Sequence, residues 1–266
     1  MFDIIDKRIG RKNKKMVVKN LAKSNSEYFG AVTALKGIGI FIIAFFWHYQ
    51  WFYPSQYPFM NIPFIHTVLW PLYRYGFLFV ELFFMLSGFG MMHGYSERIK
   101  NGTISFKEYI LKRIKKLYPL HFATLVYVII LELIWYSSHN TYWIYFDINW
   151  KSILLNLLLL QRGFLNYGAS INGPSWTISV CFLLYCLFYF IRKYLKKDLA
   201  FFLTMITISV IYLPAIIYKI GGPLYHIDIA RGIVCFTIGC IIEYLYSNNL
   251  LTNEKIRGGV SSFPFA

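Results

Sequence analysis

Seven ionisable side chains interrupt apolar stretches of this 266-residue sequence, where a charge is costly to bury and is usually kept for a function. They are Lys36, His48, Glu81, His121, Glu132, Arg231 and Glu243. All except His48, Glu81 and Glu132 lie within a turn or two of the end of their stretch, where a side chain can reach water, so a structural role is favoured for those four. Of the rest, His48 is the candidate general base near neutral pH, and Glu81 is the carboxylate that would orient His48 or another cation.

The four cysteines do not form a metal or disulfide pattern. Cys181, Cys186, Cys235 and Cys240 all lie in apolar stretches, without CxxC spacing and without a histidine at ligand spacing. We expect them to pack as small hydrophobic residues, and we predict no metal site.

The elements that must position these residues are membrane helices. Apolar residues make up 57% of the chain and aromatic residues 20%, only 15% are charged, and the mean hydropathy is +0.48. A soluble domain of this size lacks the interior for so much apolar surface, and a disordered chain would be more polar. The composition therefore predicts a protein that uses lipid as its solvent.

Six stretches are long and apolar enough to cross a bilayer, which takes ~20 residues. They cover residues 31–53, 75–95, 120–136 (opened by Pro119), 175–191, 199–218 and 229–246. The stretch 153–160 is too short to cross and is interpreted as a re-entrant or interfacial segment. The predicted fold is an all-α polytopic transmembrane helix bundle of about six spans plus that short segment.

The net charge of +15 is distributed as in a membrane protein rather than a nucleic-acid-binding one. The six predicted spans place the connecting segments alternately on the two sides of the membrane. The segments on the side of both termini carry 21 Lys and Arg residues, whereas those on the other side carry four. The positive-inside rule then makes both termini cytoplasmic. Residues 1–30 are expected to form a basic cytoplasmic arm on anionic lipid, residues 31–246 the transmembrane domain, and residues 247–266 a cytoplasmic tail.

Four strings occur in the order found in a known family. They are ALKGIG at 34–39 leading to WHY at 47–49, FVELFFMLSGF at 79–89, the basic segment 109–119 ending in Tyr-Pro, and PSWTISV at 174–180. With these strings, residues 31–246 resemble the membrane acyltransferase 3 family, apparently in a shortened form. The second string contains Ser87-Gly88, and the last contains Ser175-Trp176.

The resemblance implies a multi-pass enzyme of a bacterial plasma membrane that modifies the cell envelope. Such an enzyme moves an acyl group, commonly acetyl, from cytoplasmic acyl-CoA to a hydroxyl of an extracytoplasmic polysaccharide, glycolipid or lipid-linked sugar. Acyl-CoA would be a co-substrate rather than a permanently bound cofactor, and no nucleic acid is expected as a partner.

The resemblance also implies roles for individual residues. The family's active site includes a basic residue and a histidine of the first helix, which match Lys36 and His48. The basic loop after the second helix is associated with the acyl donor, and its matches are Arg113 and Lys116. Because CoA carries several phosphate charges, the neighbouring Lys112 is assigned to the same site. Tyr118 is included through the Tyr-Pro ending of the segment.

Four departures from the family pattern accompany these matches. Lys36 stands where arginine is usual, which replaces a bidentate group by a point charge. Lys36 and His48 are twelve positions apart, one more than usual, which turns His48 by roughly 100° unless a π-bulge restores the phase. Cys181 stands where a glutamate is usual, and fewer spans are predicted than the family typically has.

Two other functions remain open at this point. A transporter or flippase could use Glu81, Glu132 and Lys36 to line a path, although neither paired halves nor Gly/Pro-broken helices occur in corresponding places. An inactive acyltransferase remnant would also explain the missing spans and Cys181.

Overall fold

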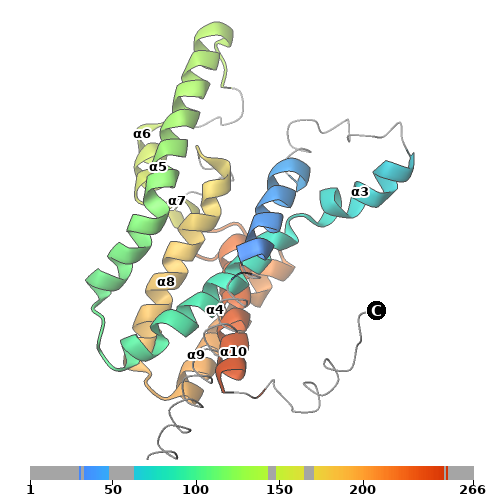
Figure 1. Ribbon diagram of the computed structural model, residues 1–266. Helices are drawn as coiled ribbons and strands as arrows, with labels where there is room; N and C mark the ends of the chain where they lie inside the picture. The colour runs from blue at the N-terminus through green and yellow to red at the C-terminus, as the bar shows by residue number, and fades with distance from the viewer. Residues whose placement is uncertain are drawn as a thin grey trace, which may run out of the picture. The chain divides into compact units, whose positions relative to one another are not determined.

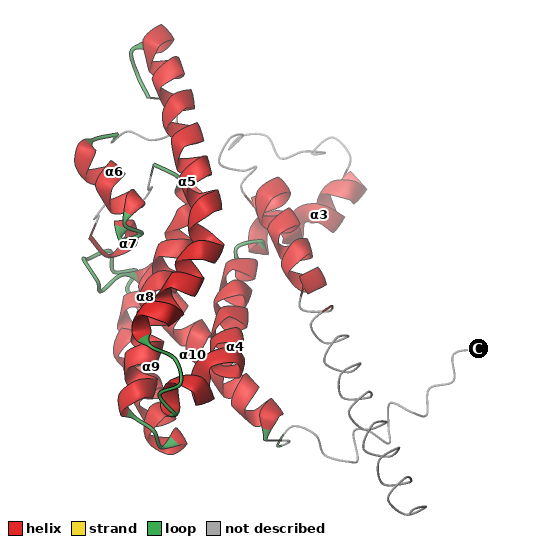
Figure 2. Ribbon diagram, turned by 60° about the vertical axis from the view of Figure 1, so that its left-hand side comes forward, coloured by secondary structure: helices red, strands yellow, loops and turns green. Residues whose placement is uncertain are grey.

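The computed structural model describes residues 30, 33–47, 63–142, 148–164, 171–248 and 250, and every regular element in these ranges is helical. The predicted all-α class is therefore confirmed (Figure 2). The chain divides into two compact units, Met1–Val80 and Glu81–Ala266.

The second unit contains the long helices. Within the described part of the chain, five helical segments are long and apolar enough to cross a membrane (Figure 1). They are α4 (Leu78–Lys100), α5 (Phe106–His139), α8 (Trp176–Tyr194) with the preceding turn η2 (Gly173–Ser175), α9 (Asp198–Ile217) and α10 (Ile227–Ser247). They correspond to the last five predicted spans, so the chain is a multi-pass membrane protein.

The first predicted span is only partly described. Residues 33–42 are α-helical and continue into the π-helix η1 (Ile43–Trp47), which together form an apolar helix shorter than the other five. Residues 48–53 of the prediction lie outside the described residues. The same unit contains α3 (Pro63–Tyr75), and the Phe46 and Tyr73 rings lie 5.2 Å apart.

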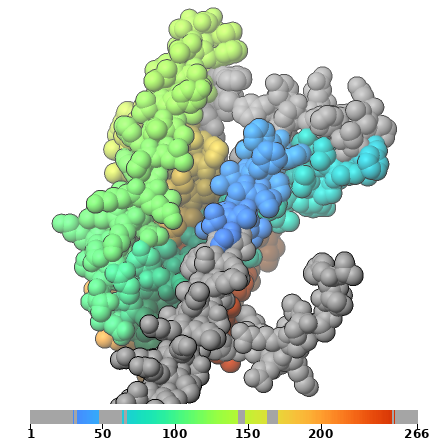
Figure 3. Space-filling view, in the orientation of Figure 1, coloured from blue at the N-terminus to red at the C-terminus, as the bar shows by residue number. Residues whose placement is uncertain are grey.

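Helix α5 begins earlier than predicted. It starts at Phe106, where the Ser105 side chain accepts a hydrogen bond from the Glu108 backbone N–H, so Pro119 lies inside the helix rather than in its first turn. The basic segment is consequently helical and not a loop. At 1.5 Å per residue, 34 residues span ~51 Å, more than the ~30 Å hydrocarbon core. Figure 3 shows the side chains of α5 as one continuous ridge.

In the described parts of the chain between α5 and α8 lie two short helices. Helix α6 (Trp150–Leu157) begins at a capping box made by Asn149 and Ser152, and α7 (Gln161–Phe164) comes after a sharp turn in which Leu159 has φ 56°. Eight residues rise only ~12 Å. The expectation that 153–160 does not form a spanning helix is confirmed, and its re-entrant or interfacial position stays a prediction.

Glycines allow α4 and α10 to cross closely. A Cβ atom on Gly88 would lie 2.0 Å from the Phe236 carbonyl oxygen, and one on Gly239 would lie 1.9 Å from that of Met85. Any side chain at either position would force the two backbones apart. Gly88 of the family-like string therefore has a packing function: it fixes how α4, which carries Glu81, lies against α10, which carries Arg231.

Candidate functional site

Four charged side chains meet where α4 and α10 begin, and we name them the arginine–carboxylate cluster: Glu81, Arg162, Asp228 and Arg231. Arg231 donates from Nε to Glu81 Oε1 over 2.6 Å and from Nη1 to Asp228 Oδ1 over 3.1 Å. Arg162 Nη2 lies 2.8 Å from the other oxygen of Asp228. The cluster is thus an alternating row of two carboxylates and two guanidinium groups.

Three helices position the cluster by their first turns. Glu81 lies in the first turn of α4 and Asp228 in the first turn of α10, where the exposed N–H groups of a helix favour a negative charge. Trp176 begins α8, and the guanidinium carbons of Arg162 and Arg231 lie 5.4 and 5.7 Å from its ring centroid. The tryptophan of the predicted motif therefore supports both arginines through cation–π contacts.

His226, just before α10, adjoins the cluster as a neutral side chain. Its Nδ1 accepts the Asp228 backbone N–H over 3.1 Å and lies 3.6 Å from Asp228 Oδ2. Burial and the charge of Arg162 lower the pKa of His226, and the opposing effect of Asp228 is smaller. Burial also lowers the pKa of Arg162.

Hydrogen bonds attach α7 to the start of α8. The buried Gln161 side chain donates from Nε2 to Ser175 Oγ over 3.1 Å, and the Arg162 backbone N–H donates to Ser179 Oγ over 3.3 Å. The predicted motif residue Ser175 therefore holds the short helix that carries Arg162. Its contribution to the site is positional.

Two atoms of the arginine–carboxylate cluster are buried and have no hydrogen-bond partner among the described residues. They are Glu81 Oε2, an acceptor, and Arg162 Nε, a donor. The side chains of Glu81 and Arg162 are 17% and 10% exposed. Buried polar atoms are normally paired, so these two indicate that the cluster has capacity for a further polar group.

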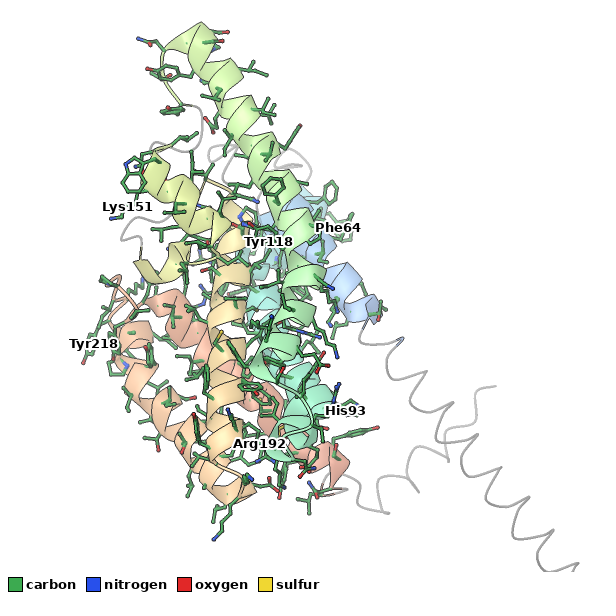
Figure 4. The ribbon with its side chains drawn as sticks, turned by 90° about the vertical axis from the view of Figure 1, so that its left-hand side faces the viewer. Phe64, His93, Tyr118, Lys151, Arg192 and Tyr218 are labelled. Carbon is green, nitrogen blue, oxygen red and sulfur yellow. The ribbon has the colours of Figure 1, made fainter. Side chains whose placement is uncertain are left out.

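The opposite end of this unit is strongly basic. The guanidinium carbon of Arg113 lies 4.8 Å from the Tyr95 ring centroid, and Arg113 Nη2 donates to the Tyr95 hydroxyl. Lys112 is exposed and lies 2.7 Å from Glu108, and Lys116 is exposed one turn further along α5. In Figure 4, the labelled residue Arg192 marks this basic end of α8, and Lys151 lies toward the other end of the unit.

Tyr118 and Ser87, two further predicted motif residues, contact other uncharged side chains. The Tyr118 ring stacks on Phe122, with centroids 6.2 Å apart, on the stretch of α5 beyond the lysines. Ser87, in the middle of α4, exchanges a 2.7 Å hydrogen bond with the Tyr185 hydroxyl of α8. Cys181 interacts with both of these hydroxyl groups, so where the family usually has a glutamate this chain has a thiol beside two neutral groups.

Lys36 belongs to the first unit, where it is exposed on the helix of residues 33–42. The π-helix η1 separates it from His48, which lies directly after η1 and outside the described residues. A π-bulge inserts one residue into a helix without changing the phase of the residues after it. The π-helical irregularity considered from the sequence is present.

Three charged or titratable residues near span ends are enclosed rather than extended to water, which corrects the sequence interpretation. Arg231 binds two carboxylates, His121 Nε2 lies 2.8 Å from the Asn156 carbonyl oxygen, and Glu243 Oε1 lies 3.1 Å from His93 Nδ1. Each of the three has partners on other helices, which the sequence distance to a span end cannot reveal.

Sequence reasoning missed Arg162, His226 and Asp228 as site residues. Arg162 counted only as one charge of a loop, and Asp228 lies just outside a predicted span. The spacing of Asp228 and Arg231, three positions apart on one helix, was the available signal for an ion pair. Nothing in the sequence indicated that Arg162 would join them.

A known protein family matches most of the chain. A model described as an acyltransferase domain, that of acyltransferase 3, matches residues 29–263, which is most of the chain. No curated protein and no solved structure matches it. With its spanning helices and this match, the chain belongs to the acyltransferase 3 family of membrane enzymes, which transfer acyl groups other than aminoacyl groups.

Proposed function

We propose that this acyltransferase moves an acyl group, acetyl in the simplest case, from cytoplasmic acyl-CoA to a hydroxyl of an extracytoplasmic polysaccharide or glycolipid. The proposal rests on one observation: the two ends of the second unit differ in charge. Glu81 and Lys100, at opposite ends of α4, are ~28 Å apart along the helix, close to the ~30 Å thickness of the hydrocarbon core. The basic end and the arginine–carboxylate cluster therefore suit opposite membrane surfaces.

The basic end suits the acyl donor. CoA phosphates are anionic, and Lys112, Arg113 and Lys116 offer cations on one stretch of α5. The positive-inside rule would make this end cytoplasmic, where acyl-CoA is made. Arg113 is held against Tyr95, so its guanidinium group is oriented before a phosphate binds.

The other end suits the acceptor. In the proposed reaction His48 removes the proton of the acceptor hydroxyl, whose oxygen attacks the thioester carbonyl carbon. The C–S bond breaks and the CoA thiolate leaves. A water molecule protonates the thiolate, and the proton that His48 removed restores that water and returns His48 to its neutral form. Lys36, twelve residues before His48 and nearer the donor, offers its positive charge to the acyl-CoA. Glu81 orients a cation, and the hydrogen bond that it accepts from Arg231 Nε supports Arg231 in that part.

Membranes containing the chain, incubated with radiolabelled acetyl-CoA, test the proposal. We expect label in the glycan or glycolipid fraction, and none with membranes that lack the chain. Movement of a lipid-linked sugar without acyl transfer would support a flippase instead. Absence of transfer from a well-inserted chain, beside a longer relative that does transfer, would identify an inactive remnant.

The proposed orientation has its own test. A cysteine introduced at Asn140, after α5, should react with an impermeant thiol reagent applied from outside, as should one at Asn166. Asn101→Cys, at the basic end, should not react. Labelling at position 101 from outside would reverse the assignment of donor and acceptor ends.

A further inference from the structure

The two unpartnered atoms of the arginine–carboxylate cluster are of opposite kinds. Glu81 Oε2 can only accept a hydrogen bond when the carboxylate is ionised, whereas Arg162 Nε can only donate one. Neither finds a partner among the described residues, although both side chains are mostly buried. Burial without a partner destabilises the protein, so each of the two atoms is expected to bind a further polar group.

Both atoms belong to one connected set of side chains. Asp228 contacts Arg231 with one oxygen and Arg162 with the other, and Arg231 binds Glu81. The two guanidinium groups also share the Trp176 ring. The free acceptor atom and the free donor atom therefore belong to the residues at the two ends of one row of ion pairs.

The charge of the cluster favours a neutral ligand. Two arginines face two carboxylates, and His226 adds no charge because its pKa is lowered. The carboxylates already occupy the first turns of α4 and α10, so the helix N-termini are also compensated. An added anion would leave one negative charge in excess, whereas an uncharged hydroxyl would not.

We propose that this cluster binds the acyl acceptor as an uncharged polyhydroxyl ring, with one hydroxyl donating to Glu81 Oε2 and another accepting from Arg162 Nε. A hydroxyl group is neutral and can both donate and accept a hydrogen bond. The assignment rests on the proposed function, and it adds Arg162 as an acceptor-binding residue and α7 as the element that carries it.

Replacing Arg162 by lysine is the sharpest test, because it keeps the positive charge beside Asp228 and removes the Nε donor. With methyl glucoside as acceptor, Arg162→Lys should raise the acceptor KM about tenfold, as expected for one lost hydrogen bond, and leave the acyl-CoA KM unchanged. The matched control is Arg192→Lys, which alters another buried arginine beside a carboxylate, Asp198, at the basic end of the unit. The control should leave the acceptor KM unchanged.

Methyl glucuronide tests the charge argument, because it differs from methyl glucoside by one carboxylate. The wild-type protein should bind the glucoside more tightly than the glucuronide. Direct calorimetric binding in lipid nanodiscs, without acyl-CoA, gives this result even if no acyl transfer occurs, so failure of the inference and failure of the proposed function are distinguishable.

Three outcomes would overturn the inference. If Arg162→Lys binds methyl glucoside like the wild type, the two atoms are satisfied by water only. If the glucuronide binds as well as the glucoside or better, the cluster does not select a neutral ring. If Arg162→Lys and Arg192→Lys weaken binding equally, the loss reflects general destabilisation.

Discussion

The two ends of the Glu81–Ala266 unit differ in how their charges are balanced. At one end, two arginines bind two carboxylates and rest on Trp176. At the other, the segments 97–116 and 192–198 together carry eleven Lys and Arg residues and three Asp and Glu residues. A balanced, enclosed cluster favours a neutral ligand, whereas an unbalanced, partly exposed one attracts an anion. The two ends of one helix bundle thus suit the two different substrates of an acyl transfer.

The largest expected effect concerns the proposed general base, His48. His48→Gln should lower turnover by ~10²–10⁴ while the protein still inserts, because the general base is lost. Transfer kinetics with radiolabelled acetyl-CoA measure this, and His139→Gln, a change at the end of α5, is the matched control. Transfer at the wild-type rate by a well-inserted His48→Gln protein would remove the central residue of the mechanism.

The next effect tests whether the balanced end depends on its arginines for stability. Arg231→Ala leaves Glu81 and Asp228 without their shared cation and should lower the free energy of unfolding by about 3 kcal/mol. Arg98→Ala is the comparison at the basic end, where the side chain is 44% exposed and 3.8 Å from Glu108, and it should cost less than about 1 kcal/mol. Denaturation in detergent measures both, and equal losses would show that the two ends do not differ in this way.

A third change disturbs the close crossing of α4 and α10, the helices that connect the two ends of the unit. Gly88→Ala places a methyl group against the Phe236 carbonyl oxygen and should destabilise the protein by about 1–3 kcal/mol. Gly90→Ala, two residues further along α4, meets nothing within 4 Å and should be neutral or slightly stabilising. Thermal unfolding of the two variants side by side decides between them, and the packing role of Gly88 fails if they are alike.

A smaller effect is expected on donor binding. Arg113→Ala should raise the acyl-CoA KM about tenfold through the loss of a charge-assisted contact, with the acceptor KM unchanged. Initial-rate kinetics with each substrate varied in turn measure the split. A rise in the acceptor KM instead would contradict the assignment of acyl-CoA to the basic end and of the acceptor to the other end.

The smallest expected effect is a pH dependence from His226. Its folded-state pKa is below the usual 6.5, so the unfolded chain binds the proton more tightly. The stability from neutral His226 is therefore complete above pH 6.5 and decreases as the pH falls below that value. Unfolding measured between pH 5 and 8 should show this slope, and His226→Gln should flatten it, whereas an unchanged slope would assign the effect to other groups.

The spans could be predicted because an apolar run of ~20 residues is a local property of the sequence. For α8, α9 and α10 the predicted and observed bounds differ by only a few residues. The start of α5 could not be predicted in this way, since its first turns are polar and are fixed by the Ser105 cap rather than by lipid. Pro119 was wrongly given a terminal position for the same reason.

By itself, the sequence determined the fold class, the family and the isolated candidate Glu81, because composition, hydropathy and short strings depend only on neighbouring residues. The tertiary structure alone decided which charges pair. Glu81 and Arg231 are 150 positions apart, and Arg162 reaches Asp228 from a short helix that no hydropathy pattern distinguishes. Their pairing results from the close crossing of α4 and α10 and from the hydrogen bonds that hold α7 against α8, because a buried charge is stable only beside the partner that packing brings to it.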